Sequence, residues 1–443
     1  MVAETRKLTR RIFIALGVLV AASVFAVLGV AFWFVRRECK RNHSVKANPV
    51  PDDHFRKIVR TRFDPPEIYN LHAATVDSTS AILTWATARE SKFEVGDAYG
   101  GSDPYVVEHS PVRYHVSELA GLKPDTEYSL RISEIDGKLE QRVSFRTLPD
   151  AGEVLFSFAA FSDNHFKPDG LSWPDGRYFR RCSDVHRCLV RDLNAEKPEF
   201  LINKGDLTDI FEPYRLRAYR EAVHGLEAPV HCIPGNHDHL RNKNFKADWL
   251  DFAGTQQVYR SFDHKGFHLV LLDTCWTGEQ ERGYLGDEQI AWLVDDLEQN
   301  ASKRTFIFTH HPVNGDVQEN RVIHDYVEFQ KAVAQFRNVA AVFSAHVHRN
   351  YVTSSQMTPD VPYVETAAVI QYPMGYNVYQ VSRSGIKQVF KKLSDISLSE
   401  ESWLSSPLRC LTNPGDAMGR ITDRSLFIEF PEQSRLSRPA QTP

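Results

Sequence analysis

Two kinds of hydrophobic pattern divide this chain. From residue 65 to about residue 149, short apolar runs alternate with polar residues as in half-buried β-strands, and 81–87 is the clearest of these runs. From residue 153 onward, continuous apolar runs are separated by stretches with helical periodicity, which is typical of an α/β unit. The pattern therefore predicts an all-β domain over 65–149 and an α/β domain over 153–393.

The α/β pattern also gives the positions of individual elements. Strands are expected at 154–161, 200–204, 229–233, 267–273, 304–309 and 339–344, with further β-like runs at 363–369 and 378–381. Helices are expected at 184–194, 214–223, 286–298 and 326–336. Residues 394–443 are rich in Ser, Pro and Arg and show little period, so we expect a C-terminal tail there.

A continuous apolar run without charge occupies residues 12–35. About 20 apolar residues suffice to cross a bilayer, so this run predicts a transmembrane anchor followed by a polar linker over 38–64. Arginines flank the run on both sides, and the positive-inside rule therefore does not orient it. Residues 9–14 resemble the twin-arginine export signal, a plain signal-anchor being the alternative. We expect an uncleaved membrane anchor with the folded domains outside the cytoplasm.

Composition excludes several classes of protein. The chain is 42% hydrophobic and 25% charged, which is ordinary for globular proteins, and its net charge of -4 offers no basic surface for nucleic acid. Six cysteines in 443 residues are too few for a disulfide scaffold. The sequence says nothing about the oligomeric state.

The all-β domain carries a recognisable turn. Residues 121–128 read Gly-Leu-Lys-Pro-Asp-Thr-Glu-Tyr, which resembles the tyrosine corner of fibronectin type III sandwiches. Trp85 stands where that family has a core tryptophan, and 143–147 resembles its last strand. The resemblance implies a fibronectin type III-like sandwich, which usually serves as a spacer or docking module.

Five short polar motifs follow strands of the α/β domain, at the edge where open α/β folds keep their sites. They are Asp163-Asn164-His165, Gly205-Asp206-Leu207-Thr208-Asp209, Gly235-Asn236-His237-Asp238, His310-His311-Pro312 and His346-Val347-His348. Carboxylate, amide oxygen and imidazole are ligands for Mn²⁺, Fe²⁺ and Zn²⁺. The motifs therefore predict a centre for two divalent metal ions, with one carboxylate between them.

The order of these motifs resembles the calcineurin-like metallophosphoesterases, which implies a four-layer α/β/β/α sandwich. By this resemblance one metal ion takes Asp163, His165, Asp206 and His348. The other takes Asp206 as the bridge with Asn236, His310 and His346. His237 is then the general acid for the leaving oxygen, and Asp238 is expected to orient it.

Two positions depart from the patterns of related families. Ala345 stands where the family usually has glycine before His-x-His, and we expect only a slight shift of the turn. The purple acid phosphatases, which also carry a fibronectin-like domain, hold ferric iron with a tyrosine where this chain has Asp209. The chain also keeps His165, which those enzymes lack, so we do not expect a purple enzyme.

The expected function is hydrolysis of phosphate mono- or diesters by a hydroxide that two metal ions activate. The alternative is a catalytically degenerate, membrane-anchored binding or adhesion protein that uses the sandwich domain. Ligand completeness discriminates between them, and no side chain of the set is missing. Substrate choice is expected to lie in the loop 166–181, which contains Trp173, Arg177 and Tyr178, and in the stretch after Asp238 with Arg241 and Lys243.

Overall fold

The computed structural model describes residues 67–430, except for 101–102, 169, 171–175, 211, 240–244, 277–280, 316–320 and 406–413. The predicted anchor over 12–35 and the linker over 38–64 lie outside this part of the chain. Among the described residues, the helices are all too short or too polar to span a bilayer.

The first described domain is a β-sandwich of two antiparallel sheets. One sheet has the order β1-β2-β5 and the other β4-β3-β6-β7. Their bounds are β1 Ile68–Val76, β2 Ser80–Ser91, β3 Phe93–Asp97, β4 Val106–Val107, β5 Val112–Ala120, β6 Glu127–Glu134 and β7 Glu140–Arg146. Trp85 of the first sheet and Phe93 of the second share one buried core. The Tyr128 hydroxyl accepts a hydrogen bond from the Lys123 N–H at 2.8 Å, as expected of a tyrosine corner.

Two six-stranded sheets form the centre of the second domain. The first has the order β10-β9-β8-β17-β18-β19, and the second has the order β11-β12-β13-β14-β16-β15. The first contains β8 Val154–Phe161, β9 Phe200–Asn203, β10 Val230–Cys232, β17 Gly375–Ser382, β18 Gly385–Lys392 and β19 Ser425–Glu429. The second contains β11 Arg260–His264, β12 Phe267–Leu271, β13 Arg304–Phe308, β14 Val339–Ser344, β15 Tyr351–Thr353 and β16 Tyr363–Glu365.

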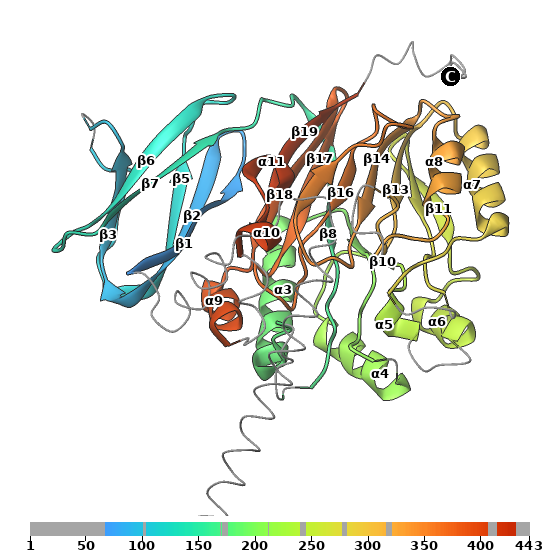
Figure 1. Ribbon diagram of the computed structural model, residues 1–443, viewed down its shortest axis with the longest axis horizontal. Helices are drawn as coiled ribbons and strands as arrows, with labels where there is room; N and C mark the ends of the chain where they lie inside the picture. The colour runs from blue at the N-terminus through green and yellow to red at the C-terminus, as the bar shows by residue number, and fades with distance from the viewer. Residues whose placement is uncertain are drawn as a thin grey trace, which may run out of the picture. The chain divides into compact units, whose positions relative to one another are not determined.

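Alternating side chains explain why these sheets stack. In β8, Phe158 and Ala160 face the core between the two sheets, whereas Ala159 and Phe161 face the helices. Successive residues of a strand point to opposite faces, so each apolar strand covers two cores. Helix α3 (Cys182–Glu196) covers the outer face of the first sheet, and α7 (Asp287–Gln299) with α8 (Tyr326–Val333) covers that of the second (Figure 1). The expected four-layer order is confirmed.

The expected strands and helices agree with the structure within a few residues at their ends. Each of the six main strands is present, and the four helices appear as α3, α4 (Pro213–Ala222), α7 and α8. Helix α5 (Asn236–His239) was not expected, because four residues are too short to show a helical period. Helix α6 (Phe245–Ala253) was not expected either.

The expectation of a tail from residue 394 is wrong for its described part. Helices α9 (Ile396–Ser405), α10 (Pro414–Met418) and α11 (Ile421–Arg424) lie here, and β19 pairs with β18 in antiparallel register. The polar composition of the segment concealed a short apolar run, Leu426 to Ile428, whose backbone completes the edge of the first sheet.

Candidate metal centre

The carboxyl ends of parallel strands bring the motifs together. Strands β8, β9 and β10 run parallel, and so do β13 and β14. The residues that follow these strands carry the seven candidate ligands: Asp163, His165, Asp206, Asn236, His310, His346 and His348. Both sheets therefore contribute side chains to one edge, as expected from the position of the motifs.

The backbone at these turns is strained. Ten non-glycine residues in the described chain have a positive φ, and five of them are candidate ligands: Asp163, His165, Asp206, His346 and His348. A left-handed backbone costs free energy for residues other than glycine, and such residues cluster at functional sites. The sharp turns direct the side chains inward from the strand ends.

Three of the candidate ligands form a first group around Asp163. The Nε2 atom of His348 lies 3.4 Å from Asp163 Oδ1 and 3.1 Å from the Nε2 atom of His165. Asp163 is fully buried, and its second oxygen, Oδ2, has no hydrogen-bond partner. A buried carboxylate oxygen without a donor is costly, and a cation in this position would satisfy it.

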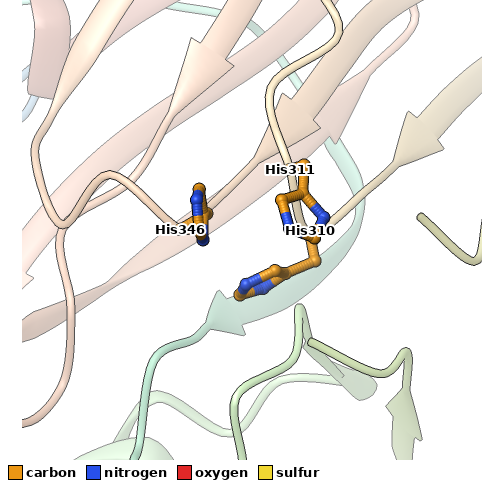
Figure 2. Close-up of side chains that lie close together, drawn as sticks. All are labelled: His310, His311 and His346. Atoms are coloured by element: carbon orange, nitrogen blue, oxygen red, sulfur yellow. The ribbon is translucent and has the colours of Figure 1, made fainter. Parts of the chain in front are cut away.

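A second group surrounds His310. Its Nε2 atom lies 3.1 Å from Asn236 Oδ1 and 3.4 Å from Asp206 Oδ2. Figure 2 shows His310 and His346 reaching the same region from two loops, with His311 beside them. The ring centroids of His310 and His346 are 5.2 Å apart.

Asp206 lies between the two groups. Its Oδ2 atom is 3.5 Å from His165 Nε2 on one side and 3.4 Å from His310 Nε2 on the other. Burial opposes ionisation, but the neighbouring His310, His237 and His165 hold the pKa of this carboxyl well below its ordinary value. An ionised carboxylate between two groups of imidazoles has the position that a bridging ligand requires.

The candidate histidines are oriented through their other nitrogen. The Nδ1 atom of His310 donates to the carbonyl oxygen of Lys204 at 2.8 Å, and that of His348 donates to Gln371 Oε1 at 2.8 Å. In both rings Nε2 is then the nitrogen that faces the centre, which is the arrangement of metal-binding histidines. Burial, with His237 nearby, keeps the pKa of His165 well below its ordinary value, so this ring is neutral. The donor set therefore fits divalent cations.

His237 lies at the edge of the centre, but Asp238 does not orient it, and that expectation is wrong. The His237 Nδ1 atom donates to the carbonyl oxygen of Asp209 at 2.6 Å. The carboxylate of Asp238 instead accepts three backbone N–H groups, those of Leu207, Thr208 and Gly235. Asp238 therefore joins the loop of Asp206 to the loop of Asn236.

Sequence reasoning missed four supporting groups. Lys204 is fully buried, and its Nζ atom donates to the Ser344 carbonyl oxygen at 2.7 Å, two residues before His346. The carbonyl oxygen of Glu281 lies 3.1 Å from His346 Nε2, and Gln371 holds His348. Burial, with His311 and His310 nearby, lowers the pKa of His346, and the guanidinium of Arg321 adds to this effect. No motif or periodicity in the sequence indicates a role for these residues, because each contacts the site from a distant part of the chain.

Two further histidines lie beside the candidate ligands, and one of them, His311, forms a group with His310 and His346 that could hold a metal ion. His311 is buried, and its Nδ1 atom lies 2.8 Å from the Thr274 hydroxyl. His239 bonds to the Asn236 carbonyl oxygen at 3.0 Å. Ala345, in place of the expected glycine, is accommodated in the turn and donates its N–H to the His310 carbonyl oxygen at 2.9 Å.

The loop 166–181 does approach the centre. The Arg177 guanidinium lies 2.5 Å from Asp209 Oδ1 and 3.5 Å from His165 Nδ1. Trp173, Arg241 and Lys243 lie outside the described residues. Of the expected substrate-loop residues, the structure therefore brings Arg177 to the centre.

Comparison with known proteins agrees with this geometry. Residues 156–350, which contain all five motifs, match the model of the calcineurin-like phosphoesterase family. A probable cyclic nucleotide phosphodiesterase of Coxiella burnetii is 25% identical over 50% of this chain and 91% of its own. A probable glycerophosphodiester phosphodiesterase of Arcobacter nitrofigilis is 27% identical over 42% of this chain and 70% of its own. A probable cyclic nucleotide phosphodiesterase of a Pseudoalteromonas strain is 29% identical over 45% of this chain and 74% of its own.

The matched family and the geometry of the site lead to the same general conclusion. The second domain is a calcineurin-like phosphoesterase domain, and the chain is a metal-dependent hydrolase. The groups of histidine and aspartate that are able to hold metal ions lie within the matched region.

Proposed function

We propose that this chain hydrolyses phosphate esters at a centre of two divalent cations. The observation that carries the proposal is the convergence of a complete ligand set on both sides of Asp206. A degenerate binding protein would have no need to keep strained turns at five of these residues. The names of the relatives favour phosphodiesters over phosphomonoesters as substrates.

The proposed ligands divide into two groups that share Asp206. The first comprises Asp163, His165, Asp206 and His348, and the second comprises Asp206, Asn236, His310 and His346. Divalent cations such as Mn²⁺, Fe²⁺ or Zn²⁺, when bound by these residues, would supply Lewis acidity and would lower the pKa of water toward neutrality. The Oδ1 atom of Asp206 accepts a hydrogen bond from the backbone N–H of His237. The Oδ2 atom of Asp206 is therefore directed between the two groups of ligands.

His237 is proposed to protonate the leaving oxygen. Its Nδ1 atom is fixed by the Asp209 carbonyl oxygen, so Nε2 is the nitrogen that exchanges protons with the substrate. The side chain of His237 is 23% exposed, so a substrate is able to reach it. Arg177 is ion-paired to Asp209 at 2.5 Å and lies 3.5 Å from His165 Nδ1, and it is proposed to border the substrate position.

The location of the enzyme is a separate proposal. The apolar run over 12–35 supports anchoring to a membrane, and the twin-arginine-like residues 9–14 support placement of the hydrolase outside the cytoplasm. Alkaline extraction of membranes tests the anchor, and protease digestion of intact cells tests the side of the membrane.

Reconstitution of the full-length chain tests the hydrolase. The protein is stripped with a chelator, refilled with Mn²⁺, Zn²⁺ or Fe²⁺, and assayed on a nitrophenyl phosphomonoester and on bis-nitrophenyl phosphate. We expect metal-dependent hydrolysis, faster on the diester, that Asp206→Asn abolishes. Asp296→Asn is the matched control, because Asp296 bonds to His268 away from the centre. Failure of the wild type to bind any metal would contradict the proposal.

A further inference from the structure

One segment of the chain, residues 369–374, contacts both the candidate metal centre and an apolar cluster that includes a residue of the β-sandwich. On its side toward the metal centre, the backbone nitrogen of Ile370 lies 3.4 Å from the Asp163 carbonyl oxygen. The Oε1 atom of Gln371 accepts a hydrogen bond from His348 Nδ1 at 2.8 Å. The position of this segment therefore determines where Gln371 lies, and Gln371 orients the candidate ligand His348.

The outer side of the same segment packs toward the sandwich. Tyr372, next to Gln371, is 1% exposed and belongs to an apolar cluster with Ala74 of β1, Phe390 of β18 and Met418. The Lys392 ammonium lies 5.1 Å from the centroid of the Tyr372 ring. A cation over a buried aromatic ring holds that ring in place, so Lys392 fixes the outer side of the segment.

Lys392 is in turn held by Glu400 of helix α9, and Glu400 contacts the sandwich. Its Nζ atom pairs with Glu400 Oε1 at 2.9 Å, and both side chains are almost completely buried. The other oxygen of Glu400 accepts the side-chain N–H of Asn70 at 2.6 Å. A buried charge that loses a partner is strongly destabilising, so the buried Glu400 carboxylate requires its hydrogen bond from Asn70. These contacts form a continuous series from Asn70 of β1 through Glu400 and Lys392 to Tyr372.

Further bonds fix β1 against the second domain. The Thr75 hydroxyl donates to the Phe390 carbonyl oxygen at 2.9 Å, and the Arg424 guanidinium donates to the Ala73 carbonyl oxygen at 2.9 Å. These bonds are buried, so water does not compete for them. The sandwich is therefore attached to the hydrolase sheet along β1, unlike a spacer on a flexible linker.

We propose that the β-sandwich is a positioning part of the metal centre. Asn70 supports Tyr372 through Glu400 and Lys392. Tyr372 in turn keeps Gln371 in the position where its Oε1 atom accepts the hydrogen bond from His348 Nδ1. This fixes the tautomer and the angle of His348, so that Nε2 faces the first group. The inference rests on the metal centre of the proposed function, but it assigns to the sandwich a role in metal affinity that a docking module would not have.

Metal titration of the apo form of the full-length chain tests this role. Asn70→Asp keeps the size and the left-handed backbone preference of Asn70 while placing a second carboxylate against Glu400. We expect the affinity for one of two Mn²⁺ ions to fall by at most about 10-fold, the smallest loss usual for a direct partner of a metal ligand, because Asn70 acts on His348 through several other residues. Val95→Ala is the matched control, because Val95 is buried in β3, in the other sheet of the sandwich. It should leave Mn²⁺ affinity unchanged.

A second variant separates positioning from general destabilisation. Gln371→Leu removes the acceptor for His348 and should weaken the same Mn²⁺ site by about 10- to 100-fold. Gln371→Glu keeps an acceptor and should restore affinity. In the double variant Asn70→Asp/Gln371→Leu the two effects should not multiply, because both act on one bond. Wild-type affinity in Asn70→Asp, or independent effects in the double variant, would overturn the inference alone. A wild type that binds no Mn²⁺ would overturn the proposed function as well.

Discussion

The Nδ1 atom of His237 lies 2.6 Å from the carbonyl oxygen of Asp209. A carbonyl oxygen only accepts hydrogen bonds, so Nδ1 carries a proton in both the neutral and the charged ring. The proton that His237 exchanges is therefore the one on Nε2. The backbone carbonyl group of Asp209 thus sets the tautomer of His237 without help from a side chain.

Replacement of His237 should depend on the leaving group. With His237→Ala, we expect kcat to fall by about 10²- to 10⁴-fold on an alkyl phosphodiester, because an alkoxide leaves slowly without a proton. Nitrophenolate leaves readily without one, so the loss on a nitrophenyl diester should be much smaller. Steady-state kinetics on the two esters measure the difference.

His264→Ala is the control for this experiment. His264 bonds to Glu199 at 2.9 Å and packs against Phe156, away from the metal centre. The control should not distinguish the two esters. An equal loss on both esters in His237→Ala would show that His237 acts on something other than the leaving oxygen.

Asp238 should matter for stability and metal affinity rather than for proton transfer. Burial raises the pKa of Asp238 to about 7, with Asp206 adding to the effect, while the three N–H groups that it accepts oppose it. Asp238→Asn turns an amide N–H group toward at least one of these donors. We expect the free energy of unfolding to fall by about 2–3 kcal/mol. Mn²⁺ affinity should fall too, because the loops of Asp206 and Asn236 are no longer joined.

Denaturant unfolding and Mn²⁺ titration measure the two effects of Asp238→Asn. The control is Asp295→Asn on α7, since Asp295 is an exposed carboxylate. If Asp238→Asn kept full stability and lost activity only on alkyl esters, Asp238 would act through His237 after all.

A histidine outside the centre gives a pH-dependent prediction. His268 lies 2.7 Å from both Asp263 and Asp296. Burial alone would lower the pKa of His268, but hydrogen bonds to Asp296 and Asp263 outweigh it and raise the pKa above 6.5. The folded state therefore binds this proton more tightly than the unfolded state. The stabilisation is complete below pH 6.5 and is lost as pH rises through the folded pKa.

Calorimetric melting of His268→Gln and of the wild type at pH 6 and pH 9 tests this dependence. The difference in Tm should be larger at pH 6, where the wild-type ring is charged between two carboxylates. His231→Gln is a suitable control, because burial lowers the pKa of His231 to about 4 and that ring stays neutral at both pH values. A difference that grows toward pH 9 would contradict the assignment.

Sequence periodicity was enough to predict the central strands and the edge where the site lies, but it did not predict β11, β15, β18 or β19. Phe158 and Ala160 alternate with Ala159 and Phe161, and this alternation requires a core on each face of β8. The motifs follow strands that are parallel, so their convergence follows from the strand order. Both features depend only on neighbours in sequence and on the period of a strand.

The hydrogen bonds that orient the site were not predictable in the same way. Gln371 and Lys204 act on His348 and on the turn of His346 across many residues of sequence. The role of Asp238 follows from two loops that meet only in the folded chain. The contact of Asn70 with Glu400 spans 330 positions, and no local pattern indicates it.

Anomalous scattering from crystals of the full-length chain grown with Mn²⁺ tests the central claim most directly. We predict two peaks about 3.5–4 Å apart, as in two-metal hydrolytic sites. One should lie by Asp163, His165 and His348, the other by Asn236, His310 and His346, with Asp206 between them. A single peak, or peaks away from Asp206, would contradict the two-metal account.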